Sequence, residues 1–219
     1  MVKLDLASFI DHTNLEPAAK TDDILRLCDE ASEWRFASVC VNPCYVSLAS
    51  ERLKGKGVSV CSVVGFPLGA NTISAKVYEA ERAFRDGAAE IDMVINISYV
   101  KNGCYDLLSK EIEAVVKSVP DCKVKVILET CLLQDDEIVR ACGEAAKAGA
   151  HFVKTSTGFS SGGATARHVE LIRHSLPPEI GVKASGGIRE RSEAELMIAA
   201  GANRLGMSRS VYICNTVSN

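Results

Sequence analysis

The sequence predicts an α/β protein folded as a single-domain (β/α)8 TIM barrel. Eight short β-branched runs alternate with longer segments whose apolar residues recur at helical spacing, which is typical of a parallel sheet covered by helices. Three of the helix-to-strand connections share one Gly-Ala pattern, at Gly87, Gly149 and Gly201, as expected of a repeated βα unit. The 219 residues are 47% apolar and contain no Pro/Ser-rich linker, so we expect one domain over residues 1–219.

The expected elements alternate regularly along the chain. The strands are Ser8–His12, Ala37–Val41, Val58–Gly65, Glu90–Ile97, Lys123–Glu129, Phe152–Thr155, Val182–Ser185 and Arg204–Met207. The helices between them are Asp22–Trp34, Tyr45–Leu53, Ile73–Asp86, Leu107–Val119, Asp135–Ala148, Ala164–Ser175 and Glu190–Ala200. Acidic residues begin the first and fifth of these helices, where carboxylates favour the positive end of the helix dipole.

Two further observations concern the end of the chain and the choice between a barrel and an open sheet. After the eighth strand only Arg209–Asn219 follows, so we expect a truncated C-terminal segment rather than a full final helix. A doubly wound open sheet is the alternative fold, but it favours a Gly-rich nucleotide loop after its first strand. No such loop follows any early strand, and the barrel is therefore preferred.

Composition excludes several classes of partner. The 25 Lys and Arg against 28 Asp and Glu are interspersed and give a net charge of -3, so nucleic acid is not an expected partner. No apolar run is long enough to span a membrane and Met1–Ile10 lacks a signal-peptide core, so we expect a cytoplasmic protein. Nine cysteines without a C-x-x-C pair are expected to be reduced and mostly buried. Cys40 and Cys44 show no metal-binding spacing, and we expect neither metal nor cofactor.

Three ionisable residues lie inside strands that otherwise read as buried. Period two places Asp92, Lys154 and Lys183 on strand faces that can point into the barrel. Each alone is explained equally well by a structural ion pair. Together they suggest catalysis, because a lysine near a second cation in a desolvated cavity has a lowered pKa and its neutral amine can form a Schiff base. A nearby carboxylate can move the protons of that reaction.

Glycines and hydroxyls follow both lysine strands. Glycine lets backbone N–H groups approach a ligand closely, and the ends of the seventh and eighth strands bind phosphate in many barrels. Gly186, Gly187, Gly206 and Ser208 occupy those places, which favours a phosphorylated substrate. Lys123 and Lys125 also repeat at period two, and we interpret them as an exposed entry to the fifth strand.

The motifs at the strand ends resemble those of the deoxyribose-phosphate aldolase family of class I aldolases. They cover nearly the whole chain: Ile10–Thr13, Ser38–Pro43, Val63–Gly69, Glu90–Asn96, Val153–Phe159 and Val182–Arg189. The resemblance implies a (β/α)8 barrel without a cofactor that cleaves 2-deoxy-D-ribose 5-phosphate reversibly to D-glyceraldehyde 3-phosphate and acetaldehyde. It also implies a homodimer or a larger homo-oligomer.

The resemblance assigns the residue roles. It implies that Lys154 forms the Schiff base, that Lys183 is the second lysine that perturbs it and takes part in proton transfer, and that Asp92 is the acid/base acting through an ordered water. It implies that the phosphate is held, mainly through backbone N–H groups, by Gly158, Gly186, Gly187 and Ser208. It also implies that Asp11 and Thr13 face the sugar.

The chain also departs from the family pattern. Phe159 stands where some members carry a lysine, and Met207 and Arg209 are bulkier than the small residues common there. Tyr212 lies too close to the eighth strand to match the C-terminal tyrosine that assists proton transfer in some members. His12, which borders a strand, is expected to make structural hydrogen bonds.

Two other functions remain open. One is a phosphate-binding barrel with other chemistry, such as an aldolase with a different donor or an isomerase. The other is a non-catalytic sugar-phosphate-binding protein, although binding alone gives no reason for both strand lysines and Asp92.

Overall fold

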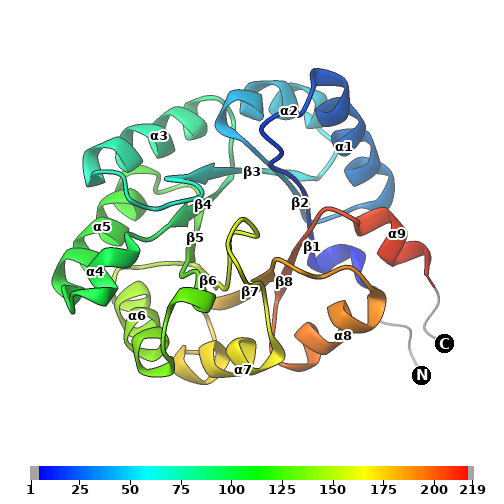
Figure 1. Ribbon diagram of the computed structural model, residues 1–219. Helices are drawn as coiled ribbons and strands as arrows, with labels where there is room; N and C mark the ends of the chain where they lie inside the picture. Colours follow the sequence, from blue (N-terminus) through cyan, green and yellow to red (C-terminus); the bar gives the residue numbers. More distant parts are fainter. Residues whose placement is uncertain (1–4, 217–219) are drawn as a thin grey trace.

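The chain folds into a closed barrel of parallel strands (Figure 1). The structure, a computed structural model, describes residues 5–216. Within this range eight strands pair in chain order and the first pairs with the last, so that the sheet has no edge. The strands are β1 (Ile10–Asn14), β2 (Ser38–Val41), β3 (Ser59–Val64), β4 (Glu90–Val94), β5 (Lys123–Ile127), β6 (Phe152–Lys154), β7 (Gly181–Ser185) and β8 (Arg204–Met207). The predicted barrel is confirmed, and the open sheet is wrong.

Helices surround the barrel in every βα connection. All seven expected helices form: α1 (Thr21–Trp34), α2 (Val46–Leu53), α3 (Ile73–Arg85), α5 (Tyr105–Ser118), α6 (Asp135–Lys147), α7 (Ala166–Ser175) and α8 (Arg191–Ala199). The described residues also form short elements that were not expected: α4 (Ile97–Lys101), α9 (Ser210–Asn215) and the 3-10 turns η1 (Ala7–Phe9), η2 (Pro43–Tyr45) and η3 (Thr130–Leu132). None of the described helices is long and apolar enough to cross a membrane.

Several strand boundaries differ from expectation, among them the ends of β1 at Asn14 and of β5 at Ile127, and two of the differences have local reasons. The first strand begins at Ile10 rather than Ser8, because the preceding residues form η1 and Ile10 is the first residue with a partner in β8. The fourth strand ends at Val94 rather than Ile97, because Asn96 caps α4 and accepts a hydrogen bond from the Ser98 backbone N–H at 3.2 Å.

In the described part of the chain, β8 is followed by the short helix α9. The six residues of α9 pack with Ser210 and Ile213 buried. The expected truncated segment also includes residues 217–219, which lie outside the described part of the chain.

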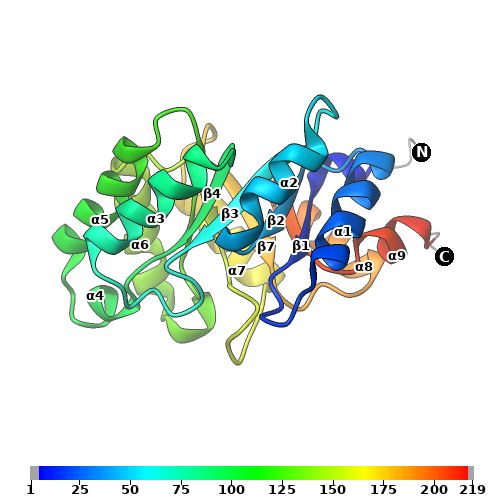
Figure 2. The same ribbon diagram turned by 90° about the horizontal axis from the view of Figure 1, so that it is seen from above.

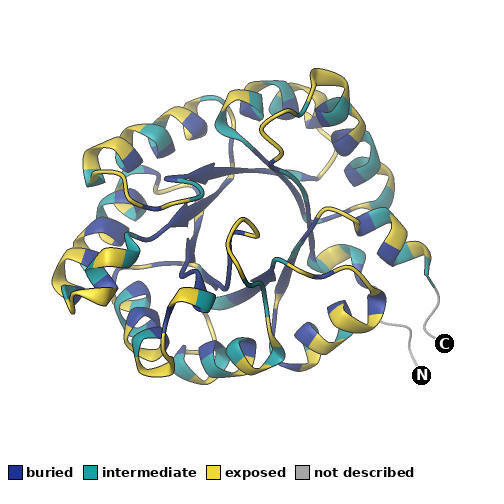
Figure 3. Cartoon of the chain, in the orientation of Figure 1, coloured by how far each residue is buried: buried dark blue, intermediate teal, exposed yellow. Residues whose placement is uncertain are grey.

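The apolar core lies between the barrel wall and the helices. Strand residues that face outward, such as Ile91 and Val126, join one buried cluster with helix residues such as Leu108 and Ile138. Figure 3 shows the strands and the inward sides of the helices as buried. The nine cysteines, all in the described part of the chain, are free thiols and five are buried, as expected.

The interior of the barrel is partly charged, and its buried charges lie beside a small apolar cluster that includes Cys61 and Val63. In β5, Val124 and Val126 belong to the outer core cluster, whereas Lys125 between them points inward and is fully buried. The β1–α1 and β6–α7 loops extend from the same end of the barrel, where they frame its mouth (Figure 2). Charged side chains thus lie beneath the face on which barrel enzymes carry their active sites.

Candidate active site

The three charged residues found in the strands meet at one carboxylate. Asp92 on β4 accepts hydrogen bonds at Oδ2 from Lys154 Nζ at 2.8 Å and from Lys183 Nζ at 2.7 Å. Lys154 and Lys183 are Cα partners on the neighbouring strands β6 and β7, so their side chains enter the barrel at the same level. All three residues are buried, and the predicted cluster is present.

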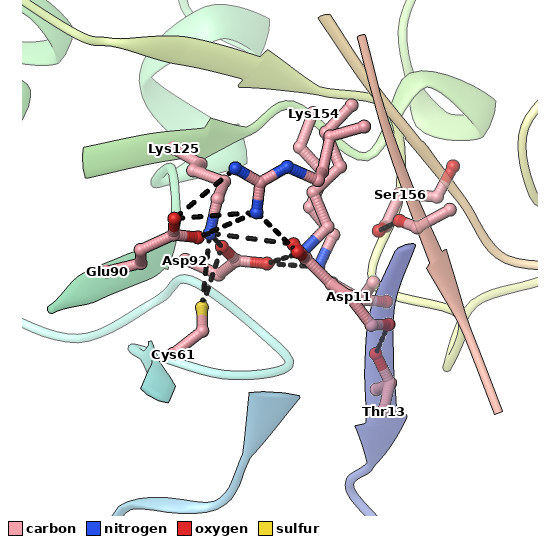
Figure 4. Close-up of polar contacts among 12 residues, drawn as sticks. Asp11, Thr13, Cys61, Glu90, Asp92, Lys125, Lys154 and Ser156 are labelled. Carbon is pink, nitrogen blue, oxygen red and sulfur yellow. Dashed lines mark hydrogen bonds and ion pairs between the residues drawn. The ribbon is translucent and has the colours of Figure 1, made fainter. Parts of the chain in front are cut away.

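A third lysine shares the same carboxylate (Figure 4). Lys125 on β5 lies 2.8 Å from Asp92 Oδ1, 2.6 Å from Glu90 Oε2 and 3.3 Å from Cys61 Sγ. The prediction of an exposed strand entry is wrong for Lys125 and correct for Lys123. Lys123 stands at the rim, whereas Lys125 lies one pleat deeper beside Asp92, its register partner in β4. Lys125 lies between apolar residues of β5, as Asp92 does in β4, and this alternation could have predicted that Lys125 is buried.

Asp11 supports Lys183 from the first strand. Its Oδ2 lies 2.5 Å from Lys183 Nζ, and its Oδ1 lies 2.6 Å from Arg204 Nη1 and accepts a hydrogen bond from Ser38 Oγ at 2.6 Å. Asp11 is fully buried and is not among the residues that line the cavity, and the expectation that it faces the sugar stays a prediction. Thr13, two residues further along the same strand face, does line the cavity.

The buried cluster carries an excess of positive groups. In the described part of the chain, the cluster has three carboxylates and four cationic side chains. The carboxylates are Asp11, Glu90 and Asp92, and the cations are Lys125, Lys154, Lys183 and Arg204. A buried charge without a counter-charge is costly, so the cluster is best balanced when one amine is neutral. Lys154 is the lysine of this cluster that lines the cavity.

The ion pairs set the protonation of the groups around Lys154. Burial by itself raises the pKa of Asp92, but the Lys125, Lys154 and Lys183 ammonium groups outweigh it and hold that pKa well below its usual value. Burial lowers the pKa of Lys183, but the Asp11 and Asp92 carboxylates outweigh it and raise that pKa above its ordinary value. Lys183 therefore stays a charged second lysine beside Lys154, because carboxylates lie against its ammonium group.

A cavity of about 820 Å³ opens above the cluster. The loops after β1, β6, β7 and β8 form its wall, and its size suits a small organic ligand. The predicted residues that line it are Thr13, Lys154, Gly158, Gly186, Gly187 and Ser208. Arg26, Arg189 and Arg209 add positive charge to the wall.

Two further cavity residues make defined contacts. Phe159, half exposed at the mouth, packs edge-on against Phe66 with ring centroids 5.3 Å apart. The His12 ring lies 2.9 Å from Ser210 Oγ and 2.7 Å from Glu30 Oε2, which are structural hydrogen bonds of the kind expected. Burial lowers the pKa of His12.

Cys40, Cys61 and Asp92 form a group that sequence spacing did not reveal. They offer three possible metal-ligand atoms within 4.8 Å of one another. The Lys125 ammonium already contacts both Cys61 Sγ, at 3.3 Å, and Asp92 Oδ1, at 2.8 Å. Two of the three donors thus have a positive partner from the chain itself, and we assign no metal to this group.

The fold and the site together define a (β/α)8 barrel enzyme with a buried lysine–carboxylate cluster at its catalytic face. The model of the DeoC/LacD family aldolases matches residues 6–208. The chain therefore belongs to the DeoC/LacD family, and it is an aldolase.

Individual relatives agree with this assignment. The chain is 56% identical to the deoxyribose-phosphate aldolase of Caldanaerobacter subterraneus subsp. tengcongensis over 96% of this chain and 92% of that protein. It is 54% identical to that of Clostridium novyi over 96% of this chain and 95% of that protein. Among solved structures, the tetrameric deoxyribose phosphate aldolase of Aeropyrum pernix superposes with a TM-score of 0.90 at 36% identity, covering 95% of this chain and 89% of that one.

Proposed function

We propose that this aldolase reversibly cleaves 2-deoxy-D-ribose 5-phosphate to D-glyceraldehyde 3-phosphate and acetaldehyde, within one domain over residues 1–219. The observation that carries the proposal is an amine, Lys154 Nζ, that meets the cavity while bonded at 2.8 Å to the buried Asp92 carboxylate. The names of the relatives at 54% and 56% identity support the substrate.

Lys154 is the nucleophile in this proposal. Its neutral amine attacks the C1 aldehyde of the open-chain sugar, and loss of water from the carbinolamine gives an iminium ion. As the C3 hydroxyl loses its proton, the C2–C3 bond breaks and its electron pair moves toward the iminium nitrogen. D-glyceraldehyde 3-phosphate leaves, the enamine takes a proton at C2, and hydrolysis releases acetaldehyde and the free amine.

Asp92 and Lys183 act on the protons of these steps. Asp92 contacts both lysines through Oδ2 and can pass protons, through a water molecule, to and from the carbinolamine hydroxyl. The raised pKa of Lys183 keeps it an ammonium group that can donate. Asp11 and Lys125 hold Lys183 and Asp92 in place from below.

The glycine-rich loops in the cavity wall suit a phosphate. Gly158, Gly186 and Gly187 have φ of 87°, 82° and 82°, which is the left-handed region that favours glycine. They line the cavity with Ser208, and we assign to these four residues the phosphate contacts, through backbone N–H groups and the serine hydroxyl. Arg189 and Arg209 in the same wall favour an anion there. We assign Thr13 to the sugar.

We also propose a cytoplasmic homo-oligomer, either a dimer or a larger assembly. The tetrameric relative from Aeropyrum pernix supports self-association. The nine free thiols support a reducing compartment.

Trapping with borohydride tests the function. The protein is incubated with acetaldehyde and sodium borohydride, digested, and analysed by peptide mass spectrometry. An adduct on Lys154 is expected, and an adduct confined to another lysine contradicts the mechanism. Lys154→Ala should abolish cleavage of 2-deoxyribose 5-phosphate and remain folded, because Asp92 keeps its contacts with Lys125 and Lys183. The exposed Lys123→Ala is the control. Wild-type binding of the sugar phosphate without turnover would instead indicate a non-catalytic binding protein.

A further inference from the structure

Glu129, directly after β5, adopts an unusual backbone conformation. Its φ of 56° and ψ of 62° lie in the left-handed region. Within residues 5–216 only Arg35 shares a positive φ among the non-glycine residues. This conformation is unfavourable for a residue with a side chain, and it persists where surrounding contacts enforce it. The Glu129 side chain is buried, with the whole residue 2% exposed, so those contacts lie inside the protein.

The Glu129 carboxylate holds the loop after the Lys154 strand. It accepts a hydrogen bond from Thr157 Oγ1 at 2.5 Å and from the Thr157 backbone N–H, whose nitrogen lies 3.3 and 3.4 Å from the two oxygens. Thr157 Oγ1 in turn accepts a hydrogen bond from the Phe159 backbone N–H at 3.0 Å. The carboxylate thus holds Thr157 directly and, through its hydroxyl, the far side of Gly158.

The residues on either side of Glu129 continue this attachment. The Leu128 backbone N–H donates to the Lys154 carbonyl at 3.0 Å, and the Thr130 backbone N–H donates to the Thr155 carbonyl at 2.9 Å. Because these backbone bonds hold the first part of the loop without Glu129, the carboxylate acts mainly beyond Thr155. Its effect therefore falls on Gly158 more than on Lys154.

The attachment made by Glu129 matters for function because it places Gly158. Gly158 lines the cavity with a φ of 87°, and its Cα lies 3.3 Å from the position of a Cβ built on Gly186. Two glycines assigned to the phosphate therefore meet backbone to backbone. A displacement of Gly158 would move its own N–H group and change its close approach to Gly186.

We infer that Glu129 is a positioning residue for the phosphate end of the cavity: its buried carboxylate fixes Thr157 and thereby sets Gly158 against Gly186. This inference rests on the proposed function. A carboxylate is suited to the task because it accepts from the hydroxyl and the N–H at once, and charged acceptors form stronger hydrogen bonds than neutral ones.

Glu129→Gly tests the role of the side chain, because glycine adopts the left-handed backbone readily and the whole side chain with its carboxylate is lost. The measurements are kcat and KM for 2-deoxyribose 5-phosphate and for 2-deoxyribose, which lacks the phosphate. We expect KM for the phosphorylated sugar to rise about tenfold or more, and the preference for it over 2-deoxyribose to fall by the same factor. Arg35→Gly makes the same backbone change at the exposed end of α1, and should leave both values unchanged.

Two further variants separate positioning from general damage to the fold. Thr157→Val keeps the side-chain shape and removes the hydroxyl, so it should lower the same preference, and the double variant should add little. Glu129→Gln keeps one acceptor oxygen and should restore part of the preference. Thr157→Val also serves if Glu129→Gly does not fold.

Three outcomes would overturn the inference. One is an unchanged preference in Glu129→Gly and Thr157→Val. Another is an equal loss for both sugars together with lost acetaldehyde labelling of Lys154, which would place the effect on the lysine. If the wild type cleaves neither sugar, the proposed function fails, and calorimetric titration with inorganic phosphate decides the inference separately. Weaker phosphate binding by Glu129→Gly than by Arg35→Gly would then support it, and equal binding would overturn it.

Discussion

Replacing Lys125 with methionine removes the buried cation that we predicted to be exposed, while keeping an unbranched side chain of nearly the same length. The Lys125 ammonium is fully buried and lies 2.6 Å from Glu90 and 2.8 Å from Asp92. Breaking a buried ion pair by removing one partner costs about 3–5 kcal/mol when the other charge is left unpaired.

The surroundings of Lys125 place the cost at the low end of that range. After the substitution Glu90 still lies 3.1 Å from Arg204, and Asp92 keeps both Lys154 and Lys183. The cluster then has three carboxylates and three cations in place of three and four, so no carboxylate loses its last partner. We expect the free energy of unfolding to fall by about 3 kcal/mol, and Tm to fall by about 6–12 °C.

Urea denaturation followed by circular dichroism measures this loss, with Lys123→Met as the matched control. Lys123 lies two residues earlier on the same strand and is exposed, so its replacement should change the free energy of unfolding by about 0.5 kcal/mol or less. Equal urea midpoints for the two variants would refute the reasoning.

The same variant has a consequence for catalysis. With three cations matched to three carboxylates, no amine of the cluster needs to be neutral for balance. We therefore expect kcat for 2-deoxyribose 5-phosphate to fall about tenfold at pH 7. A kcat equal to that of Lys123→Met would contradict the charge balance argued for the site.

Two other predictions concern pH and the phosphate loops. Because burial lowers the pKa of His12 below its ordinary 6.5, the unfolded chain binds the proton more readily, and stability present above that value is lost as the pH falls below it. His12→Gln should therefore show a smaller drop in urea midpoint between about pH 7.5 and pH 5.5 than the wild type, and an equal drop would argue against this. Gly186→Ala places a Cβ 3.1 Å from the Gly163 Cα at a φ of 82°, and it should raise KM for 2-deoxyribose 5-phosphate about tenfold. Gly55→Ala, equally left-handed but in open space, should leave KM unchanged, and a similar KM for both variants would count against the assigned phosphate site.

The fold and the cluster of three strand charges could be predicted because both depend on local patterns. The number of alternating runs predicted the eight strands and the seven helices between them, and Asp92, Lys154 and Lys183 stood out as charges inside apolar strands. Buried charges need partners, and the two lysines form ion pairs with Asp92. The same rule applied to Lys125, but its strand began with a second lysine that is exposed, and the pair together looked like a solvated entry.

Depth in the barrel was not readable from the chain. Period two places Asp11 and Thr13 on one face of β1, but only the closed sheet puts Asp11 among the buried charges and Thr13 on the cavity wall. The role of Glu129 was also hidden, because its partner Thr157 lies 28 residues away, after the neighbouring strand β6. No local pattern marks either residue for its task.

The sequence by itself determined the (β/α)8 barrel, the inward lysines with their carboxylate, and the glycine-rich loops above them, because each follows from periodicity and residue chemistry within a few positions. Only the tertiary structure decided which cations share the Asp92 carboxylate and that cations outnumber carboxylates in the buried cluster. It also decided which side chain holds the loop that carries Gly158. The physical reason is that closing the sheet brings the strands into a fixed register. That register sets the distances between side chains on different strands, and the Coulomb energies that determine their protonation depend on those distances.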